Sequence, residues 1–141
     1  MTLSRPLGWF AAGLLALPAY YLWVHGNGGG GASDSPTSFR VVYVTAPDAG
    51  VAAQLAEAAV KEKLASCVNV LPEVRSVYEW EGKVEKSTEA MLVIKSSVER
   101  LAALELLVKK MHPYDVPEFL VLPVAGGSSE YLQFLGQGMN L

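Results

Sequence analysis

The stretch RSVYEWEGKVEKSTEAMLVIKS, from Arg75 to Ser96, predicts two long extended arms joined by a turn. Polar and apolar residues alternate in both arms, which is the period of a β-strand with one covered face. Gly82 lies between the arms and supplies the backbone freedom that a tight turn needs. We therefore expect a long β-ribbon whose aromatic residues, Tyr78 and Trp80, need cover, and oligomerisation is the simplest cover.

A strand, a helix and a second strand precede the ribbon. Residues 39–46 form a β-branched and aromatic run that stops at Pro47, and Asp48 can cap the following helix. The run SCVNVLPEV, residues 66–74, predicts a strand that Pro72 breaks or confines to an edge. Between these strands, apolar residues recur at helical spacing: Ala52, Leu55, Ala56, Ala59, Val60 and Leu64.

A second helix and a last strand follow the ribbon. Ser96 and Glu99 have the spacing of a capping box, and Pro113 ends the helix. Residues 118–124 predict the last long strand, and a short amphipathic tail begins near Ser129. The packing stripe of the helix is Leu101, Leu104, Val108 and Met111.

The element order βαββαβ, with two helices on one side of an antiparallel sheet, is the α+β ferredoxin-like arrangement. This fold is shared by many unrelated proteins, so by itself it indicates no function.

A hydrophobic segment precedes the domain. Residues 7–24 carry no charge, and their length of roughly 18 residues is near the lower limit for a membrane helix. We expect residues 1–25 to be membrane-directed, either as an uncleaved anchor or as a cleaved signal. Residues 26–38 then form a Gly/Ser-rich tether, and residues 39–141 form the domain. The expected location is membrane-associated, with the secretory pathway or an organelle after cleavage as the alternative.

Composition excludes several classes of function. The net charge of −3 over 141 residues provides no basic surface for a nucleic acid. Cys67 is the only cysteine, which rules out an intramolecular disulfide and a site with several thiolates from one chain. The sequence contains no dinucleotide, P-loop or zinc-protease motif, so an enzyme is the least favoured class.

Several long motifs, in the correct order, make the chain resemble the CutA divalent-cation tolerance family. They are TAPD after the first strand, the segment KLASCVN continuing through the ribbon, and HPYDVPEFLVLPV near the end. The resemblance implies a ferredoxin-like subunit, a homotrimer and an association with copper or another divalent cation, but no demonstrated reaction. Some bacterial relatives carry further cysteines where this chain has apolar residues such as Val44 and Leu107, which weakens the case for soft-metal binding.

Four residues are candidate metal ligands. His112 lies after the second helix, and Asp115 and Glu118 follow in a loop held by prolines, so an imidazole lies near two carboxylates. Cys67 matches the cysteine of the ACVN-like motif of the family. The alternatives are that His112 only completes a helix end and that Cys67 is a small buried hydrophobe.

The ribbon supplies four candidate ligand-binding residues, Tyr78, Trp80, Glu89 and Lys95. The resemblance places their equivalents around a cleft between subunits, whereas the alternative is that the aromatic pair only fills the trimer interface. Two rival functions stay open beside metal binding. One is a sensor of an anionic metabolite, built like the nitrogen-regulatory trimers and using Lys95, and the other is a membrane-tethered scaffold for a partner protein.

Overall fold

The computed structural model describes residues 37–141, so the predicted hydrophobic segment 7–24 and most of the tether lie outside the described residues. The division of the chain into these segments stays a prediction. The described elements are β1 (Phe39–Ala46), α2 (Ala49–Lys61), β2 (Cys67–Trp80), β3 (Lys83–Ser97), the 3-10 turn η1 (Val98–Arg100), α3 (Leu101–Met111), β4 (Leu120–Pro123) and α4 (Ser129–Gly138).

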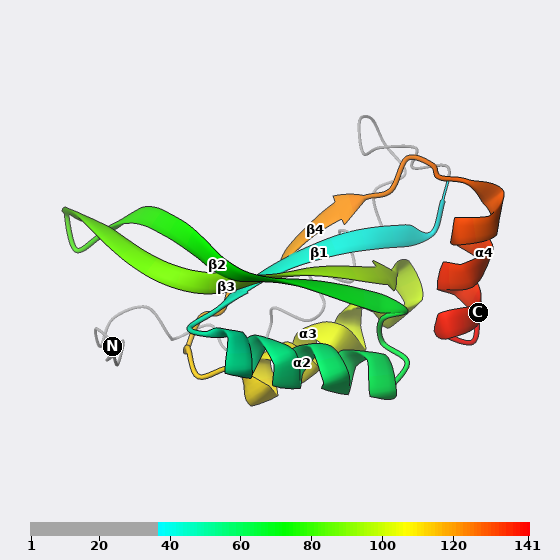
Figure 1. Cartoon of the computed structure of the whole chain (residues 1–141), viewed down its shortest axis with the longest axis horizontal. Coiled ribbons are helices and arrows are strands. Elements are labelled where there is room, and N and C mark those ends of the chain that lie inside the picture. Colours follow the sequence, from blue (N-terminus) through cyan, green and yellow to red (C-terminus); the bar gives the residue numbers. More distant parts are fainter. Residues whose placement is uncertain (1–36) are drawn as a thin grey trace. The chain divides into compact units, whose positions relative to one another are not determined.

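The four strands form one antiparallel sheet in the order β2-β3-β1-β4, which confirms the predicted α+β, ferredoxin-like fold (Figure 1). β1 pairs with β3 over its whole length, from Phe39 opposite Ser97 to Ala46 opposite Ala90. β4 is short and lies on the other side of β1. The last strand is therefore shorter than predicted.

The ribbon consists of β2 and β3, and its outer half projects beyond the other strands (Figure 1). Glu81 and Gly82 both have positive φ, which is the two-residue turn whose twist suits a hairpin. Pro72 does not break β2, because a register shift between Leu71 and Val74 adds one residue to this strand and places the proline in a bulge.

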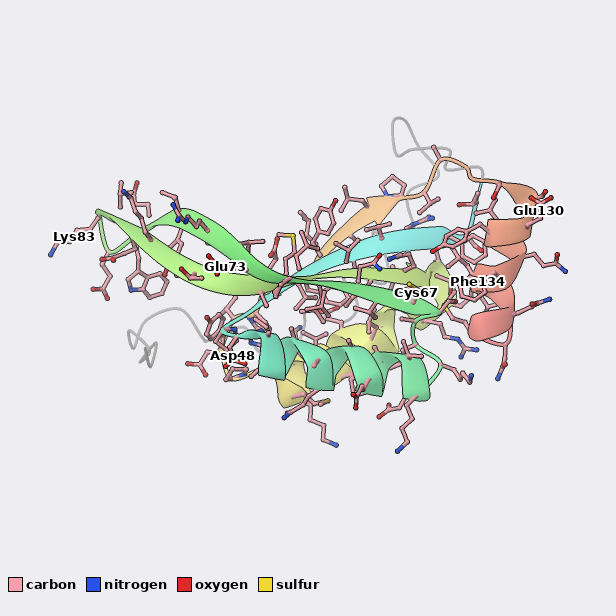
Figure 2. All side chains as sticks on the ribbon, in the orientation of Figure 1. Asp48, Cys67, Glu73, Lys83, Glu130 and Phe134 are labelled. Carbon is pink, nitrogen blue, oxygen red and sulfur yellow. The ribbon has the colours of Figure 1, made fainter. Side chains whose placement is uncertain are left out.

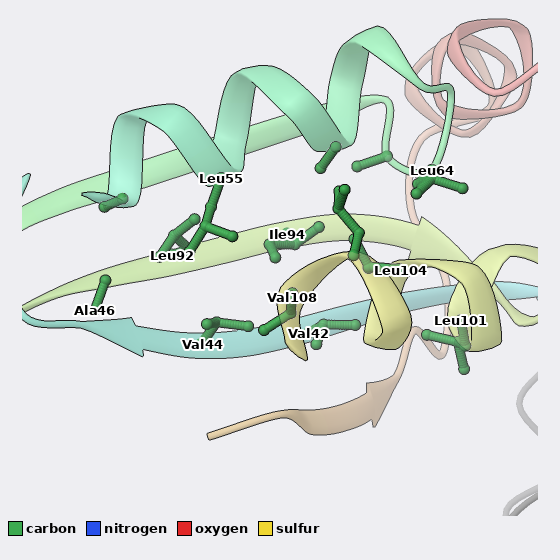
Figure 3. Packing of buried hydrophobic residues seen from close by; sticks show 14 of the residues in the cluster. Val42, Val44, Ala46, Leu55, Leu64, Leu92, Ile94, Leu101, Leu104 and Val108 are labelled. Carbon is green, nitrogen blue, oxygen red and sulfur yellow. The ribbon is translucent and has the colours of Figure 1, made fainter. Parts of the chain in front are cut away.

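Helices α2 and α3 cover one face of the sheet and enclose the core (Figure 3). Where β1 and β3 pair, their even-numbered residues point toward these helices, because side chains alternate along a strand and the two strands pair even with even. The largest fully buried side chains of this core include Val42, Val44, Leu92, Ile94 and Leu104.

Two residues predicted to pack in the core are exposed. Val60 and Met111 are each 38% exposed. The buried stripe of α2 consists of Ala52, Leu55 and Ala59, and Val60 follows Ala59 by about 100° of helix rotation. Met111 is the last residue of α3.

The predicted capping box at Ser96 is wrong. Ser96 is still part of β3, and its hydroxyl donates to the carbonyl of Leu64 at 2.7 Å instead of capping a helix. The turn η1 follows, so α3 begins at Leu101 without a side-chain cap. Strand pairing, which extends to Ser97 opposite Phe39, overrides the local capping signal.

Helix α4, predicted as a short amphipathic tail, packs at one end of the sheet (Figure 1). The hydroxyl of Ser66 donates to the carbonyl of Leu135, and Arg100 donates to the carbonyl of Met139 at 2.8 Å. The side chain of Met139 is fully buried. Gly138 lies directly against Ser66, so the helix packs closely at this point.

We expect Gly138→Ala to lower the free energy of unfolding by about 1–3 kcal/mol, the usual cost of overpacking. An added Cβ would lie 2.8 Å from the Cβ and 3.1 Å from the Cα of Ser66, so side-chain rotation alone cannot relieve the clash. Gly136→Ala is the matched control, since its nearest neighbour would be 3.8 Å away. Urea denaturation of both variants checks this, and equal midpoints would contradict it.

Candidate functional site

The carboxylate of Glu89 is buried on β3 where the ribbon leaves the rest of the sheet. Its residue is only 8% exposed. No lysine, arginine or histidine of residues 37–141 forms an ion pair with it, and the ion pair found there joins Lys109 to Glu105. Buried carboxylates are normally paired with a cation or bound to a metal. In the described part of the chain, Glu89 is therefore a buried charge that lacks the cationic partner such a group normally has.

Tyr114, in the connection between α3 and β4, is the side chain that contacts this carboxylate. Its hydroxyl donates to Oε1 of Glu89 at 3.2 Å. Burial and then the charge and hydrogen bond of Glu89 raise the pKa of Tyr114 to about 12, and the nearby Tyr78 and Asp48 add to the increase. The candidate site therefore combines β3, the ribbon strand β2, the start of α2 and the α3–β4 connection.

His112 lies beside Tyr114 and is 7% exposed. Its Nε2 lies 2.7 Å from the carbonyl oxygen of Thr45, and its Nδ1 lies 3.1 Å from the backbone nitrogen of Tyr114. A backbone N–H can only donate, so Nδ1 accepts, and Nε2 carries the proton that is donated to Thr45. Both ring nitrogens are thus occupied, and a metal at either one would have to replace a hydrogen bond.

The other predicted metal ligands are spread over the subunit. Asp115 is exposed and Glu118 is half-buried, both in the connection that follows His112. Cys67 lies at the opposite end of the sheet from Asp48, next to α4 (Figure 2). Residues 37–141 contain no group of three or more His, Cys, Asp or Glu side chains that could hold a metal. Metal binding by these four residues stays a prediction, because the described part of one chain does not bring them together into one group.

The predicted ligand-binding residues also lie in different parts of one chain. Tyr78 and Glu89 both lie near Tyr114. Trp80 pairs with Lys83 beside the ribbon turn. Lys95 lies opposite Cys67 and donates to the side-chain oxygen of Asn69.

Lys95 is six residues from Glu89 on the same strand, a separation of about 20 Å at 3.3 Å per residue. A single cleft that contains all four ligand-binding residues stays a prediction, and it needs a second subunit.

Sequence reasoning missed the role of Tyr114 and treated Asp48 only as a helix cap. The cap is present, since Oδ1 of Asp48 accepts from the backbone of Val51 at 2.9 Å. The signal for Tyr114 was its place in HPYD, two residues after a candidate ligand and directly after a proline. Nothing in the sequence pairs it with Glu89, which is 25 residues away.

Known sequences of one family match this chain over most of its described residues. The sequence model of the CutA1 divalent ion tolerance protein family matches residues 40–138. The chain is 50% identical over 95 residues to the chloroplastic protein CutA of Arabidopsis thaliana, which covers 67% of this chain and 52% of that protein. It is 46% identical over 109 residues to the divalent-cation tolerance protein CutA of Pectobacterium atrosepticum, covering 77% and 99%. The chain thus spans about half the length of the plant relative.

Solved structures match as well. The divalent cation tolerance protein of Thermus thermophilus is 42% identical with a TM-score of 0.67, covering 69% of this chain and 94% of that one. The periplasmic divalent cation tolerance protein CutA of Archaeoglobus fulgidus is 33% identical with a TM-score of 0.69, covering 72% and 98%. The names of these relatives describe tolerance proteins and state no enzymatic reaction.

The predicted membrane association is wrong. Among the relatives, the Arabidopsis thaliana protein is named chloroplastic and the Archaeoglobus fulgidus protein is named periplasmic. No helix within residues 37–141 is long and apolar enough to cross a membrane. Residues 7–24, on which the prediction depended, lie outside the described residues. The membrane-tethered scaffold depended on the same segment, so it loses its support as well.

We expect Glu89→Gln to lower the pKa of Tyr114 from about 12 while leaving it above 10, because burial, the largest cause, remains. Spectrophotometric titration of each protein, after subtraction of its Tyr114→Phe counterpart, isolates this phenol. Glu85→Gln is the control on the same face of the ribbon. Because folding raises this pKa, the neutral phenol contributes stability below pH 10, and that contribution is lost as the pH rises through about 12. An equal pKa of Tyr114 in wild type and in Glu89→Gln would contradict the contact between the two residues.

Proposed function

Because the chain belongs to the CutA1 divalent ion tolerance family, we propose that it is a homotrimer that binds a divalent cation such as copper in the response to these ions. The names of the relatives state divalent-cation tolerance, and the buried carboxylate of Glu89 is the observation on which the proposal depends.

Glu89 fits a cation because its charge is buried without a positive partner in residues 37–141. A divalent cation would supply that partner, and carboxylate oxygens are common ligands of such ions. One carboxylate and a phenol are too few ligands for a metal centre. The remaining ligands would come from water or from a neighbouring subunit.

The ribbon supports the trimer. Apolar side chains in its outer half are exposed in a single chain, and Val77 and Val84 are 63% and 70% exposed. This half of the strand pair projects beyond the sheet (Figure 1). β2 is also an edge strand of the sheet. Long apolar edges of this kind are normally covered by another chain, and closed symmetry is the usual way to do so.

A small-molecule sensor is the second candidate function. The phenols of Tyr78 and Tyr114 near Glu89 favour it, because together they can hydrogen-bond a polar ligand in a cleft between subunits. An anionic ligand would need Lys95, and about 20 Å of strand separates this residue from Glu89 within one chain. Such a ligand would therefore contact the Lys95 end of one subunit and the Glu89 end of another.

We expect native mass spectrometry of the purified protein at micromolar concentration to show three copies of the chain, since the exposed ribbon needs cover. Val77→Lys with Val84→Glu should shift the mass toward one copy, and Glu57→Gln on the outer face of α2 is the control. A single-copy mass for the wild type would refute the trimer. A bound organic molecule in metal-free protein would favour the sensor.

We expect Glu89→Gln to weaken Cu²⁺ binding at least about tenfold, or roughly 1.4 kcal/mol, because the amide removes the negative charge and keeps the shape. Isothermal titration of Cu²⁺ into wild type, Glu89→Gln and Glu85→Gln measures this. Glu85→Gln removes a charge from the same face of the ribbon, so it controls for loss of general electrostatic attraction. Equal weakening in both variants would exclude Glu89 as a specific ligand.

A further inference from the structure

We propose that His112 is a positioning residue, which holds the α3–β4 connection against β1 and thereby holds the hydroxyl of Tyr114 on Glu89. This inference deepens the proposed function and depends on it for its biological meaning. The geometry itself can be tested without any metal.

The imidazole of His112 bridges two segments that are distant in sequence. On one side Nε2–H donates to the carbonyl of Thr45, near the end of β1 and 67 residues away. On the other side Nδ1 accepts from the N–H of Tyr114, two residues further along the chain. The ring is buried, so neither hydrogen bond competes freely with water. The connection is thereby fixed to the sheet beside Glu89.

Few other polar contacts hold this connection. Within the described chain, residues 113–119 form no backbone-to-backbone hydrogen bond with one another or with neighbouring elements. Pro113 has no N–H, so the N–H of Tyr114 is the first one available after the helix, and it bonds to His112. The hydroxyl of Tyr114 makes the other polar contact, with Glu89. Loss of the imidazole would therefore leave the backbone of Tyr114 without its hydrogen-bonded support.

The imidazole also restricts the ring of Tyr114. The two ring centroids are 4.8 Å apart with an angle of 62° between the planes, an edge-to-face contact. The backbone hydrogen bond and the ring contact act on the same residue, whose hydroxyl points to Glu89. His112 therefore influences Glu89 through Tyr114 and does not contact the carboxylate itself.

Two substitutions separate the hydrogen bonds of His112. In His112→Asn the side-chain oxygen can occupy the place of Nδ1 and still accept from Tyr114, but the side chain is too short to reach Thr45. In His112→Gln the amide can reach Thr45 but has no acceptor at the place of Nδ1. If His112 only completes a helix end, Tyr114 should respond alike in the two variants. If His112 positions Tyr114, the hydrogen bond and position of Tyr114 should stay closer to wild type in His112→Asn than in His112→Gln.

NMR reports both contacts of Tyr114. Amide hydrogen exchange reports its backbone hydrogen bond to His112, and the Cζ chemical shift of the labelled residue reports the contact of its hydroxyl with Glu89. We expect the Tyr114 amide to exchange about tenfold faster in His112→Gln, consistent with the loss of one hydrogen bond, and to remain near the wild-type rate in His112→Asn. The Cζ shift in His112→Gln should move in the direction seen in Glu89→Gln, and His112→Asn should restore it. Equal behaviour of the two variants would overturn the proposal.

A measurement on the wild type keeps the test decisive if a variant fails to fold. The nitrogen chemical shifts of His112 should show a neutral ring with the proton on Nε2, and a proton on Nδ1 would overturn the proposal. Titration with Cu²⁺ then separates the two hypotheses. If Glu89→Gln leaves Cu²⁺ affinity unchanged while the NMR effects of His112→Gln appear, the metal function fails and the positioning role stands.

Discussion

The antiparallel pairing of β1 with β3 determines both the core and the place of the candidate site. Its register puts even residues opposite even residues, so that Val42, Val44 and their partners all face the helices. A shift of one residue would turn the apolar set of one strand toward the open face, which the burial of this set forbids. The pairing ends at Ala46 opposite Ala90 because Pro47 ends β1. Glu89 is therefore the first residue of β3 beyond its pairing with β1.

This position explains why a charged residue can be buried there. The core residues stop at Ala90, and beyond it the hydroxyl of Tyr114 reaches Glu89 from the α3–β4 connection, with Asp48 at the start of α2 near the same phenol. The connection is held there because His112 joins it to the carbonyl of Thr45, the residue before the last one in β1. The same strand end thus terminates the apolar core, anchors the connection and leaves a buried carboxylate that accepts from the hydroxyl of Tyr114.

Local signals predicted those parts of the fold that depend on neighbouring residues. β1 was predicted with its observed bounds, and Asp48 caps α2 as expected, because both follow from residues within one turn or strand. The capping box at Ser96 failed because pairing with a strand more than fifty residues away extends β3 past it. Of the two predicted alternatives for Pro72, a break is wrong and an edge strand is observed, whereas the bulge that keeps the proline within β2 depends on the partner strand and has no local signal. The contact of Tyr114 with Glu89 joins residues 25 apart, so no local period indicates it.

The buried carboxylate links the stability of the subunit to what it binds. Desolvation of Glu89 costs free energy, and the single phenol hydrogen bond offsets only part of that cost. A positive group that reaches Glu89 in the folded state, but not in the unfolded chain, stabilises the fold by an amount that rises with the logarithm of its concentration relative to its dissociation constant. The same reasoning applies to a metal ion, to an organic cation and to a basic side chain of a neighbouring subunit. The strain of an unpaired buried charge is therefore a reason to expect that this end of the sheet is completed by something outside the single chain.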